Sequence, residues 1–232
     1  MDKQFESLTK DIKKSFIADF SEDSKVLLVA FGGVGGELSI PAFEFFNLTR
    51  GFPVKKIFIR DLKQVWYACG VPELGNSIEE VAASLAQYRD REGVKKVILV
   101  GNSMGGYAAL LFGWLIQADI VHAFCPQTYI NQKLRFLHFD SRWKSYLKKM
   151  YRNKEVKNTY FDLKKVFTLE LKKTLFYIHY TKGDRIDRIH AQRMAKFPGV
   201  VLCGYEGSDH WMVHSLKKTG TLKKILTKSL AI

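Results

Sequence analysis

The sequence predicts a doubly wound α/β fold with a mostly parallel sheet, in a chain of 232 residues. Three observations support this prediction. Short apolar runs recur along the chain, helical stretches separate them, and the runs lack the alternation of polar and apolar residues that marks a half-exposed strand. Strands of this kind are typical of a parallel sheet that helices cover on both faces. We expect residues 1–232 to form one domain.

Six runs rich in Val, Ile, Leu and Phe are the predicted strands: Lys25–Phe31, Val54–Arg60, Lys96–Val100, Ile120–Cys125, Thr174–Tyr180 and Val200–Tyr205. Four stretches are predicted helices: Ser77–Tyr88, Met104–Ile116, Ile189–Phe197 and Leu222–Leu230. The first of these helices has a clear start signal, because Ser77 and Glu80 stand at the spacing of a capping box. Near the N-terminus, apolar residues also recur at helical spacing: Phe5, Leu8, Ile12, Phe16 and Phe20.

One segment interrupts this alternation of strands and helices. Residues 130–173 are rich in lysine and carry aromatic side chains at short intervals, Trp143 among them. A connection of about 40 residues is too long for an ordinary link between two elements of such a fold. We therefore predict that residues 130–173 form a cap, inserted after the strand Ile120–Cys125.

The net charge of +14 is concentrated in two segments. Gln127–Lys173 contains 13 Lys or Arg against four Asp or Glu, and Leu216–Ile232 contains five Lys and no acid, so the rest of the chain is balanced. This distribution does not fit a uniformly basic nucleic-acid binder. We expect no nucleic-acid partner.

Composition also bears on the compartment. No apolar run approaches the roughly 20 residues that a membrane-spanning helix needs, and residues 1–20 do not resemble a secretory signal. Cys69, Cys125 and Cys203 are an odd, widely spaced set, which is typical of free thiols in a reducing compartment and not of a disulfide framework. We expect a cytoplasmic protein that does not insert into membranes.

The strongest chemical signal is the sequence GNSMG at residues 101–105, between the strand Lys96–Val100 and a predicted helix. This is a G-x-S-x-G motif in the strand–turn–helix context of a nucleophile elbow. The sharp turn strains the backbone of the serine and presses its neighbours against the adjacent strand and helix, so these neighbours must be small. We predict that Ser103 is a nucleophile at the positive end of a helix, where developing negative charge is stabilised.

A serine nucleophile needs a histidine base and a carboxylate that orients this base. With this elbow, the order along the chain is serine, acid, histidine, each at the C-terminal end of a strand. Asp184 and His210 each follow a predicted strand, so we predict Ser103, Asp184 and His210 as the catalytic residues. Two alternatives stay open. Asp187 is a rival acid, although it lies where a helix starts and is suited to cap it, and His214 is a rival base.

The oxyanion hole of such a site requires two backbone N–H donors. One belongs to the residue after the nucleophile, Met104, and the other comes from the loop after the first strand of the sheet. That loop is glycine-rich over Gly32–Gly36, which lets the backbone approach a substrate oxygen closely, and we predict Gly33 as the second donor. A nucleotide-binding turn does not fit the same loop, because Leu38 stands where that turn needs glycine.

With these motifs, the sequence resembles the α/β-hydrolase superfamily over about residues 25–216, apart from the predicted cap. The resemblance rests on the glycine-rich loop, the elbow, Asp184 and His210. It departs from the family at residues 31–33, which are Phe-Gly-Gly where many members have His-Gly. The resemblance implies hydrolysis of an ester, thioester or amide, or acyl transfer, through an acyl-serine intermediate.

The expected function is therefore a serine hydrolase that acts on an acyl ester. An acyltransferase or thioesterase that works with an acyl carrier is the alternative, since it would use the same residues. A non-catalytic binding module is disfavoured, because binding alone needs no elbow serine.

Substrate contacts are predicted at Trp66 and Tyr67, in the segment after the second predicted strand, and at Trp143 in the cap. The basic cap suits an anionic small-molecule ester, or an acidic carrier protein that presents a thioester. The alternative is that its lysines form only a solvated surface. No cofactor is expected, and no metal, because the i,i+4 pair His210 and His214 lacks a Glu or Cys to complete a site.

Overall fold

Seven strands form one sheet in the part of the chain that the computed structural model describes, residues 8–35, 43–168, 173–207, 210 and 212–231. Along the chain they are Phe16–Asp19 (β1), Val26–Phe31 (β2), Lys55–Ile59 (β3), Lys96–Asn102 (β4), Ile120–Phe124 (β5), Leu175–Thr181 (β6) and Val200–Tyr205 (β7). They lie in the order β1-β3-β2-β4-β5-β6-β7, and all neighbours are parallel except β1 and β3. The predicted doubly wound, mostly parallel sheet is confirmed.

The helices of the described residues are Phe46–Thr49 (α2), Ile78–Arg91 (α3), Met104–Leu115 (α4), Gln132–Leu137 (α5), Lys144–Arg152 (α6), Leu163–Val166 (α7), Arg185–Gln192 (α8), Met212–Lys218 (α9) and Thr221–Leu230 (α10). Helix α3 starts as the sequence predicts, because the Ser77 hydroxyl accepts a hydrogen bond of 3.1 Å from the Glu80 N–H. No helix of these described residues is long and apolar enough to cross a membrane.

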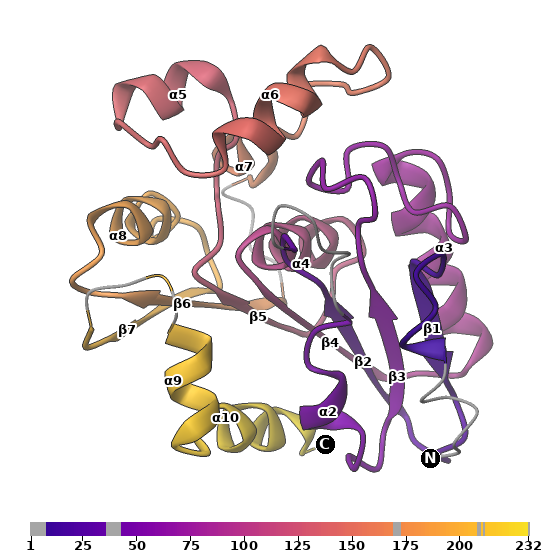
Figure 1. The fold of residues 1–232 in the computed structure, drawn as a ribbon. Helices are drawn as coiled ribbons and strands as arrows, with labels where there is room; N and C mark the ends of the chain where they lie inside the picture. Colours follow the sequence, from indigo (N-terminus) through magenta and orange to yellow (C-terminus); the bar gives the residue numbers. More distant parts are fainter. Residues whose placement is uncertain (1–7, 36–42, 169–172, 208–209, 211, 232) are drawn as a thin grey trace.

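Helices cover both faces of the sheet (Figure 1). Successive side chains of a strand point to opposite faces, so the sheet contributes to two apolar cores. The larger core lies against α3, α4 and α6, and the smaller one against α2, α9 and α10. In β2, Leu27 and Val29 belong to the larger core, and Leu28 and Ala30 to the smaller. All of β2 is buried, which explains why its sequence shows no polar alternation.

The edge strand β1 is not among the predicted elements. It pairs antiparallel with β3, with Phe16 opposite Ile59. Within β1, Ile17 and Asp19 are buried while Phe16 and Ala18 are half-buried, which is the period of a strand. The helical spacing seen in the sequence is therefore misleading at this end, since the free edge of β3 offers backbone pairing. Phe5, at the other end of that pattern, lies outside the described residues.

Between β5 and β6 the chain forms the short helices α5, α6 and α7, and we call residues 130–168 the insertion. Its inner side chains join the larger core: Leu147, Met150, Leu163 and Phe167. On its outer side, Phe136 and Phe139 are 83% and 81% exposed. Residues 169–172 of the predicted cap lie outside the described part of the chain, and the role of a cap stays a prediction.

Candidate active site

The turn between β4 and α4 holds Ser103 in a strained backbone conformation. Its φ of 54° and ψ of −117° lie in a region that residues other than glycine rarely occupy. Two glycines make the turn possible. A Cβ on Gly101 would lie 2.0 Å from the Gly105 carbonyl oxygen, and one on Gly105 would lie 2.2 Å from the Phe31 carbonyl oxygen. The close packing that the motif predicts is present at both glycines.

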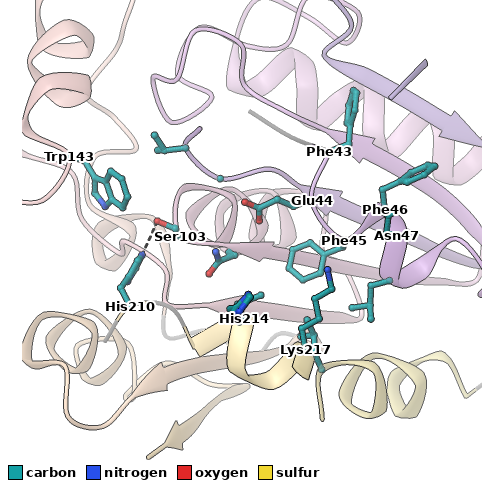
Figure 2. Close-up of a pocket in the computed structure, with 16 residues that line it drawn as sticks. Phe43, Glu44, Phe45, Phe46, Asn47, Ser103, Trp143, His210, His214 and Lys217 are labelled. Carbon is teal, nitrogen blue, oxygen red and sulfur yellow. Dashed lines mark hydrogen bonds between the residues drawn. The ribbon is translucent and has the colours of Figure 1, made fainter. Parts of the chain in front are cut away.

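Ser103 lies at the N-terminus of α4 and is 5% exposed. Its Oγ is 3.1 Å from Nε2 of His210, which belongs to the segment between β7 and α9 (Figure 2). The same Oγ accepts a hydrogen bond of 3.0 Å from Nε2 of Gln127. The predicted serine and histidine are thus brought together, while His214, the alternative base, is an exposed residue of α9.

The carboxylate beside the histidine belongs to Asp187, not to Asp184. Nδ1 of His210 lies 2.9 and 3.1 Å from the two carboxylate oxygens of Asp187. Asp184 is the N-cap of α8, and its Oδ1 accepts hydrogen bonds from the N–H groups of Ile186 at 2.8 Å and Asp187 at 2.9 Å. The prediction that Asp184 orients the histidine is therefore corrected. Helix α8 begins earlier than predicted, at Arg185, so Asp184 takes the capping role that was expected of Asp187.

Arg142, from the insertion, is the second partner of Asp187. Its Nη1 donates to Oδ1 of Asp187 at 2.7 Å and lies 3.3 Å from Nδ1 of His210. Burial opposes ionisation of Asp187, but the hydrogen bonds and charges of its two partners outweigh burial and lower the pKa of this carboxyl to about 2. Asp187 is therefore an anion at neutral pH. It fixes the Nδ1–H tautomer of the histidine, which leaves Nε2 free to accept a proton from Ser103.

Trp66 and Tyr67, two of the predicted substrate contacts, are fully buried and are not among the residues that line the cavity at Ser103. The cause is the buried carboxylate of Asp61, which follows β3. Its Oδ2 accepts a hydrogen bond of 2.9 Å from the N–H of Tyr67 and draws this segment inward. The prediction that these two aromatic residues contact substrate is therefore wrong.

Both aromatic residues instead support other parts of the site. Nε1 of Trp66 donates to Oε1 of Gln127 at 3.3 Å. Trp66 thus fixes the side-chain amide of Gln127 that donates to Ser103. The hydroxyl of Tyr67 donates to the Gly32 carbonyl oxygen at 2.8 Å. This bond fixes the glycine-rich loop beside the serine.

The N–H of Gly33, the predicted second oxyanion donor, hydrogen-bonds to the carboxyl group of Glu44. A Cβ on Gly33 would lie 2.9 Å from Oε1 of Glu44 and 3.1 Å from the Asn102 carbonyl oxygen, which favours glycine at this position. Burial raises the pKa of Glu44 to about 7, although the Gly33 hydrogen bond acts in the opposite direction. Figure 2 shows Glu44 directed toward Ser103. A carboxyl oxygen of Glu44 thus occupies the N–H that the sequence predicts as an oxyanion donor, and that role of Gly33 stays a prediction. Gly36, the last glycine of the loop, lies outside the described residues.

A cavity of about 400 Å³ opens at Ser103 and His210 (Figure 2). Most of its lining is apolar: Val34, Phe43, Phe45, Phe46, Leu48, Trp143, Val213 and Leu222. Further polar side chains line it as well: Glu44, Asn47, Asn102, His214 and Lys217. Trp143, the third predicted substrate contact, does line the cavity, and its ring centroid lies 6.1 Å from that of His210.

Cys125, Asp187 and His210 place potential metal ligands within 4.8 Å of one another. The Cys125 thiol is free, and burial together with the nearby Asp187 charge raises its pKa, so that the thiolate a metal needs is disfavoured. The guanidinium of Arg142 also lies 2.7 Å from Asp187. A metal ion would meet a neutral thiol and a fixed cation, so this cluster does not fit a metal.

Gln127, Arg142 and Glu44 are site residues without a motif in the sequence. Gln127 carries a usable signal, because it follows β5 closely and the C-terminal ends of parallel strands meet at one edge of a sheet. Arg142 and Glu44 do not directly follow a strand of the sheet, so their positions in the sequence carry no such signal. Their place at the site depends on contacts between distant parts of the chain.

Several solved structures have a similar fold, whereas no protein-family model and no curated protein sequence matches the chain. The capsule O-acetyltransferase of Neisseria meningitidis serogroup A gives a TM-score of 0.63 at 16% identity, over 90% of each chain. MGS-MChE2, an α/β hydrolase from a lagoon-sediment metagenome, gives 0.55 at 18% identity, over 92% of this chain and 94% of that one. The esterase Est2 of Thermogutta terrifontis gives 0.56 at 13% identity, over 90% and 85%. The likeness is one of fold.

Proposed function

We propose that this protein, which has the fold of the α/β hydrolases, is a serine enzyme that cleaves an acyl ester through an acyl-serine intermediate. The observation that supports the proposal most directly is the series of contacts from Ser103 Oγ to His210 Nε2, at 3.1 Å, and from His210 Nδ1 to Asp187, at 2.9 Å. Esterases and an O-acetyltransferase are among the solved structures of similar fold, which supports a reaction at an ester bond. A protein that only binds ligands needs neither the strained serine nor the aligned histidine.

In the proposed reaction, His210 is the general base for Ser103. As Oγ attacks the acyl carbon, its proton passes to Nε2 of the histidine. The bond from the acyl carbon to the alcohol oxygen then breaks, and the departing oxygen takes that proton. Asp187 stays ionised and stabilises the imidazolium while it exists. Water or a second alcohol then attacks the acyl-serine, with His210 again as the base, and restores the Ser103 hydroxyl.

We assign the oxyanion donors to the N–H groups of Met104 and Gly33. Met104 opens α4, so its N–H belongs to the unpaired first turn of a helix and gains from the helix dipole. At Gly33, the acyl oxygen has to displace the carboxyl group of Glu44. With its pKa raised to about 7, Glu44 is neutral in a large share of molecules near neutral pH, which lowers the cost of this displacement.

Acyl transfer to an alcohol is the second candidate function. It is favoured by the similarity in fold to the capsule O-acetyltransferase over 90% of each chain. One structure of that enzyme, in a mutant form, is a complex with CoA. In this chain, Lys217 lines the cavity and belongs to the basic C-terminal segment, so an anionic acyl donor would meet a cation there.

Rapid mixing with p-nitrophenyl acetate, followed by an acid quench and mass spectrometry of the intact protein, tests the proposal. We expect the wild type to gain one acetyl group, carried by the peptide that contains Ser103, and we expect Ser103→Ala to gain none. An acetyl group on another residue, or turnover that Ser103→Ala retains, contradicts the proposal.

The two candidate functions differ in what removes the acyl group. With increasing concentrations of an added alcohol or sugar, a hydrolase forms only the free acid, and the rate of p-nitrophenol release does not rise. A transferase forms the new ester and releases p-nitrophenol faster. Product analysis by mass spectrometry separates these outcomes, with the Ser103→Ala variant as the background.

A further inference from the structure

Arg142 ties the insertion to helix α8 through a series of charged side chains. Nη1 of Arg142 donates to Oδ1 of Asp187 at 2.7 Å, and its Nε donates to Oδ1 of Asp140 at 3.2 Å. Oδ2 of Asp140 in turn lies 3.3 Å from Nε2 of His190. Asp187 and His190 stand three residues apart on α8 and so share one face of it. We call Asp140, Arg142, Asp187 and His190 the clamp.

Three of the four clamp residues are buried, and Arg142 is half-buried. The side chains of Asp187 and His190 are 0% exposed, that of Asp140 is 2% exposed and that of Arg142 21%. Although burial opposes its ionisation, His190 and Arg142 hold the pKa of Asp140 well below its usual range. Burial lowers the pKa of His190 to about 4, and its Nδ1 accepts a hydrogen bond from the Thr128 N–H, so His190 is neutral and donates from Nε2. Of the four groups, Arg142 is the cation at neutral pH.

This cation also faces the histidine of the site. Nη1 of Arg142 and Nδ1 of His210 are 3.3 Å apart, and both donate to Asp187. Among the described residues, Cys125 of the segment after β5 also lies beside His210, and burial raises the pKa of its thiol. Nδ1 of His210 therefore lies beside one anion, Asp187, and one cation, Arg142, with Asp140 one contact further away.

We propose that Arg142 is a positioning residue: it fixes the carboxylate that orients His210, and its charge, 2.7 Å from Asp187 and 3.3 Å from Nδ1 of His210, contributes to the pH dependence of the reaction at Ser103. This inference rests on the proposed function, because it concerns the base that serves Ser103. It gives the insertion a part in the chemistry through one half-buried arginine, independent of the lysines on its surface.

The test is the pH dependence of Ser103 labelling by a fluorophosphonate, followed by mass spectrometry in wild type, Arg142→Gln and Arg142→Lys. Arg142→Gln loses the charge, and we expect the midpoint of its acid limb to move to higher pH by about one unit. Arg142→Lys keeps the charge but loses the forked geometry, so it should keep the midpoint and label a few times more slowly.

Arg193→Gln is the matched control. Arg193 is also largely buried, contacting Asp162 at 2.8 Å and the Thr128 carbonyl oxygen at 3.0 Å, but it is not part of the clamp. Its loss should lower the thermal midpoint of unfolding and leave the acid limb in place. A purely structural role for Arg142 would give the same pattern.

An acid limb that is identical in wild type and Arg142→Gln, with Ser103 labelled in both, overturns the inference and leaves the proposed function standing. A wild type that is not labelled at Ser103 overturns the proposed function itself. If Arg142→Gln does not fold, Asp140→Asn decides the question. It removes the carboxylate that offsets Arg142, so the midpoint should move to lower pH, and an unchanged midpoint contradicts the inference.

Discussion

The two sides of the candidate site are held in place by different means. On the serine side, neutral backbone groups fix the turn: the N–H of Ser103 donates to the Phe124 carbonyl oxygen at 2.9 Å, and Gly105 packs directly on the backbone of β2. On the acid–histidine side, α8, the insertion and the segment after β7 are joined by side chains. One of these contacts is the ion pair of Arg142 and Asp187, at 2.7 Å.

This difference decides what each side tolerates. Backbone hydrogen bonds and close packing do not titrate, but they leave no room for added atoms. Ion pairs accept small changes in volume, but they lose their energy when one charge is removed and the other stays buried. The serine side should therefore be sensitive to bulk, and the acid–histidine side to charge and pH.

The largest expected effect is on the serine side. Ser103→Ala removes the proposed nucleophile and should lower kcat for a p-nitrophenyl ester on the order of 10⁴-fold or more. The smaller side chain adds no bulk, so the thermal midpoint of unfolding should stay at or above that of the wild type. Turnover close to the wild-type value would show that the elbow serine takes no part in the reaction.

On the acid–histidine side, Asp187→Asn should lower kcat by about 10³- to 10⁴-fold, because a neutral amide no longer fixes the Nδ1–H tautomer or stabilises the imidazolium. Asp184→Asn is the matched control. Asparagine caps a helix about as well as aspartate, so its kcat should stay within a few-fold of the wild type. Steady-state kinetics with both variants separates the two carboxylates, and a loss confined to Asp184→Asn would reverse their assignment.

Added bulk should damage the serine side specifically. In Gly105→Ala the new Cβ would lie 2.2 Å from the Phe31 carbonyl oxygen, so the free energy of unfolding should fall by about 3 kcal/mol. Gly51→Ala is the control, since a Cβ there meets no atom within 4 Å. Urea unfolding at neutral pH measures both variants, and equal stabilities would contradict the close packing of the elbow.

Lowering the pH should destabilise the clamp, which contains a titratable histidine, before it changes the backbone contacts of the elbow. The pKa of His190 falls from 6.5 to about 4 on folding, so the unfolded chain binds a proton first as the pH drops. The free energy of unfolding should therefore decrease between pH 6.5 and 4, by about 3 kcal/mol for this group. His190→Asn should flatten that dependence, whereas His214→Asn, at an exposed residue of α9, should leave it unchanged in urea unfolding at a series of pH values.

The smallest effect is expected for surface charge on the insertion. Four exposed lysines of the insertion lie outside the cavity: Lys148, Lys149, Lys164 and Lys165. Changing them to Gln should therefore alter kcat/KM for a neutral p-nitrophenyl ester less than about twofold. Lys217→Gln, at the cavity, should raise KM several-fold for a matched anionic ester and weaken its dependence on ionic strength. Equal salt dependence of the two esters in the wild type would remove the case for an anionic substrate.

The serine side could be predicted from the sequence because its determinants are neighbours in the chain. Five consecutive residues, 101–105, contain both the proposed nucleophile and the glycines that its turn requires. The buried strands could also be predicted from the sequence, because each is a continuous apolar run. The half-buried edge strand β1 could not. Its four residues are too few to set an alternating pattern against the helical spacing around them.

The acid–histidine side was predicted only in part, since its determinants are far apart in the chain. Asp184 and Asp187 both follow β6, and only the start of α8 decides which one caps the helix and which one faces the histidine. Arg142 reaches Asp187 from 45 residues away, and no spacing in a single sequence reports such a contact. Trp66 and Tyr67 were misplaced for a similar reason, because the buried Asp61 carboxylate turns them inward.

The central claim is that Ser103, His210 and Asp187 act as one unit, and the rate of fluorophosphonate labelling in three proteins tests it most directly. Wild type, Asp184→Asn and Asp187→Asn are labelled side by side, and the adduct is mapped by mass spectrometry. We expect the label on Ser103, a wild-type rate in Asp184→Asn, and a rate at least about 100-fold lower in Asp187→Asn. A label on any other residue, or an Asp187→Asn variant that is labelled as fast as the wild type, would contradict the claim.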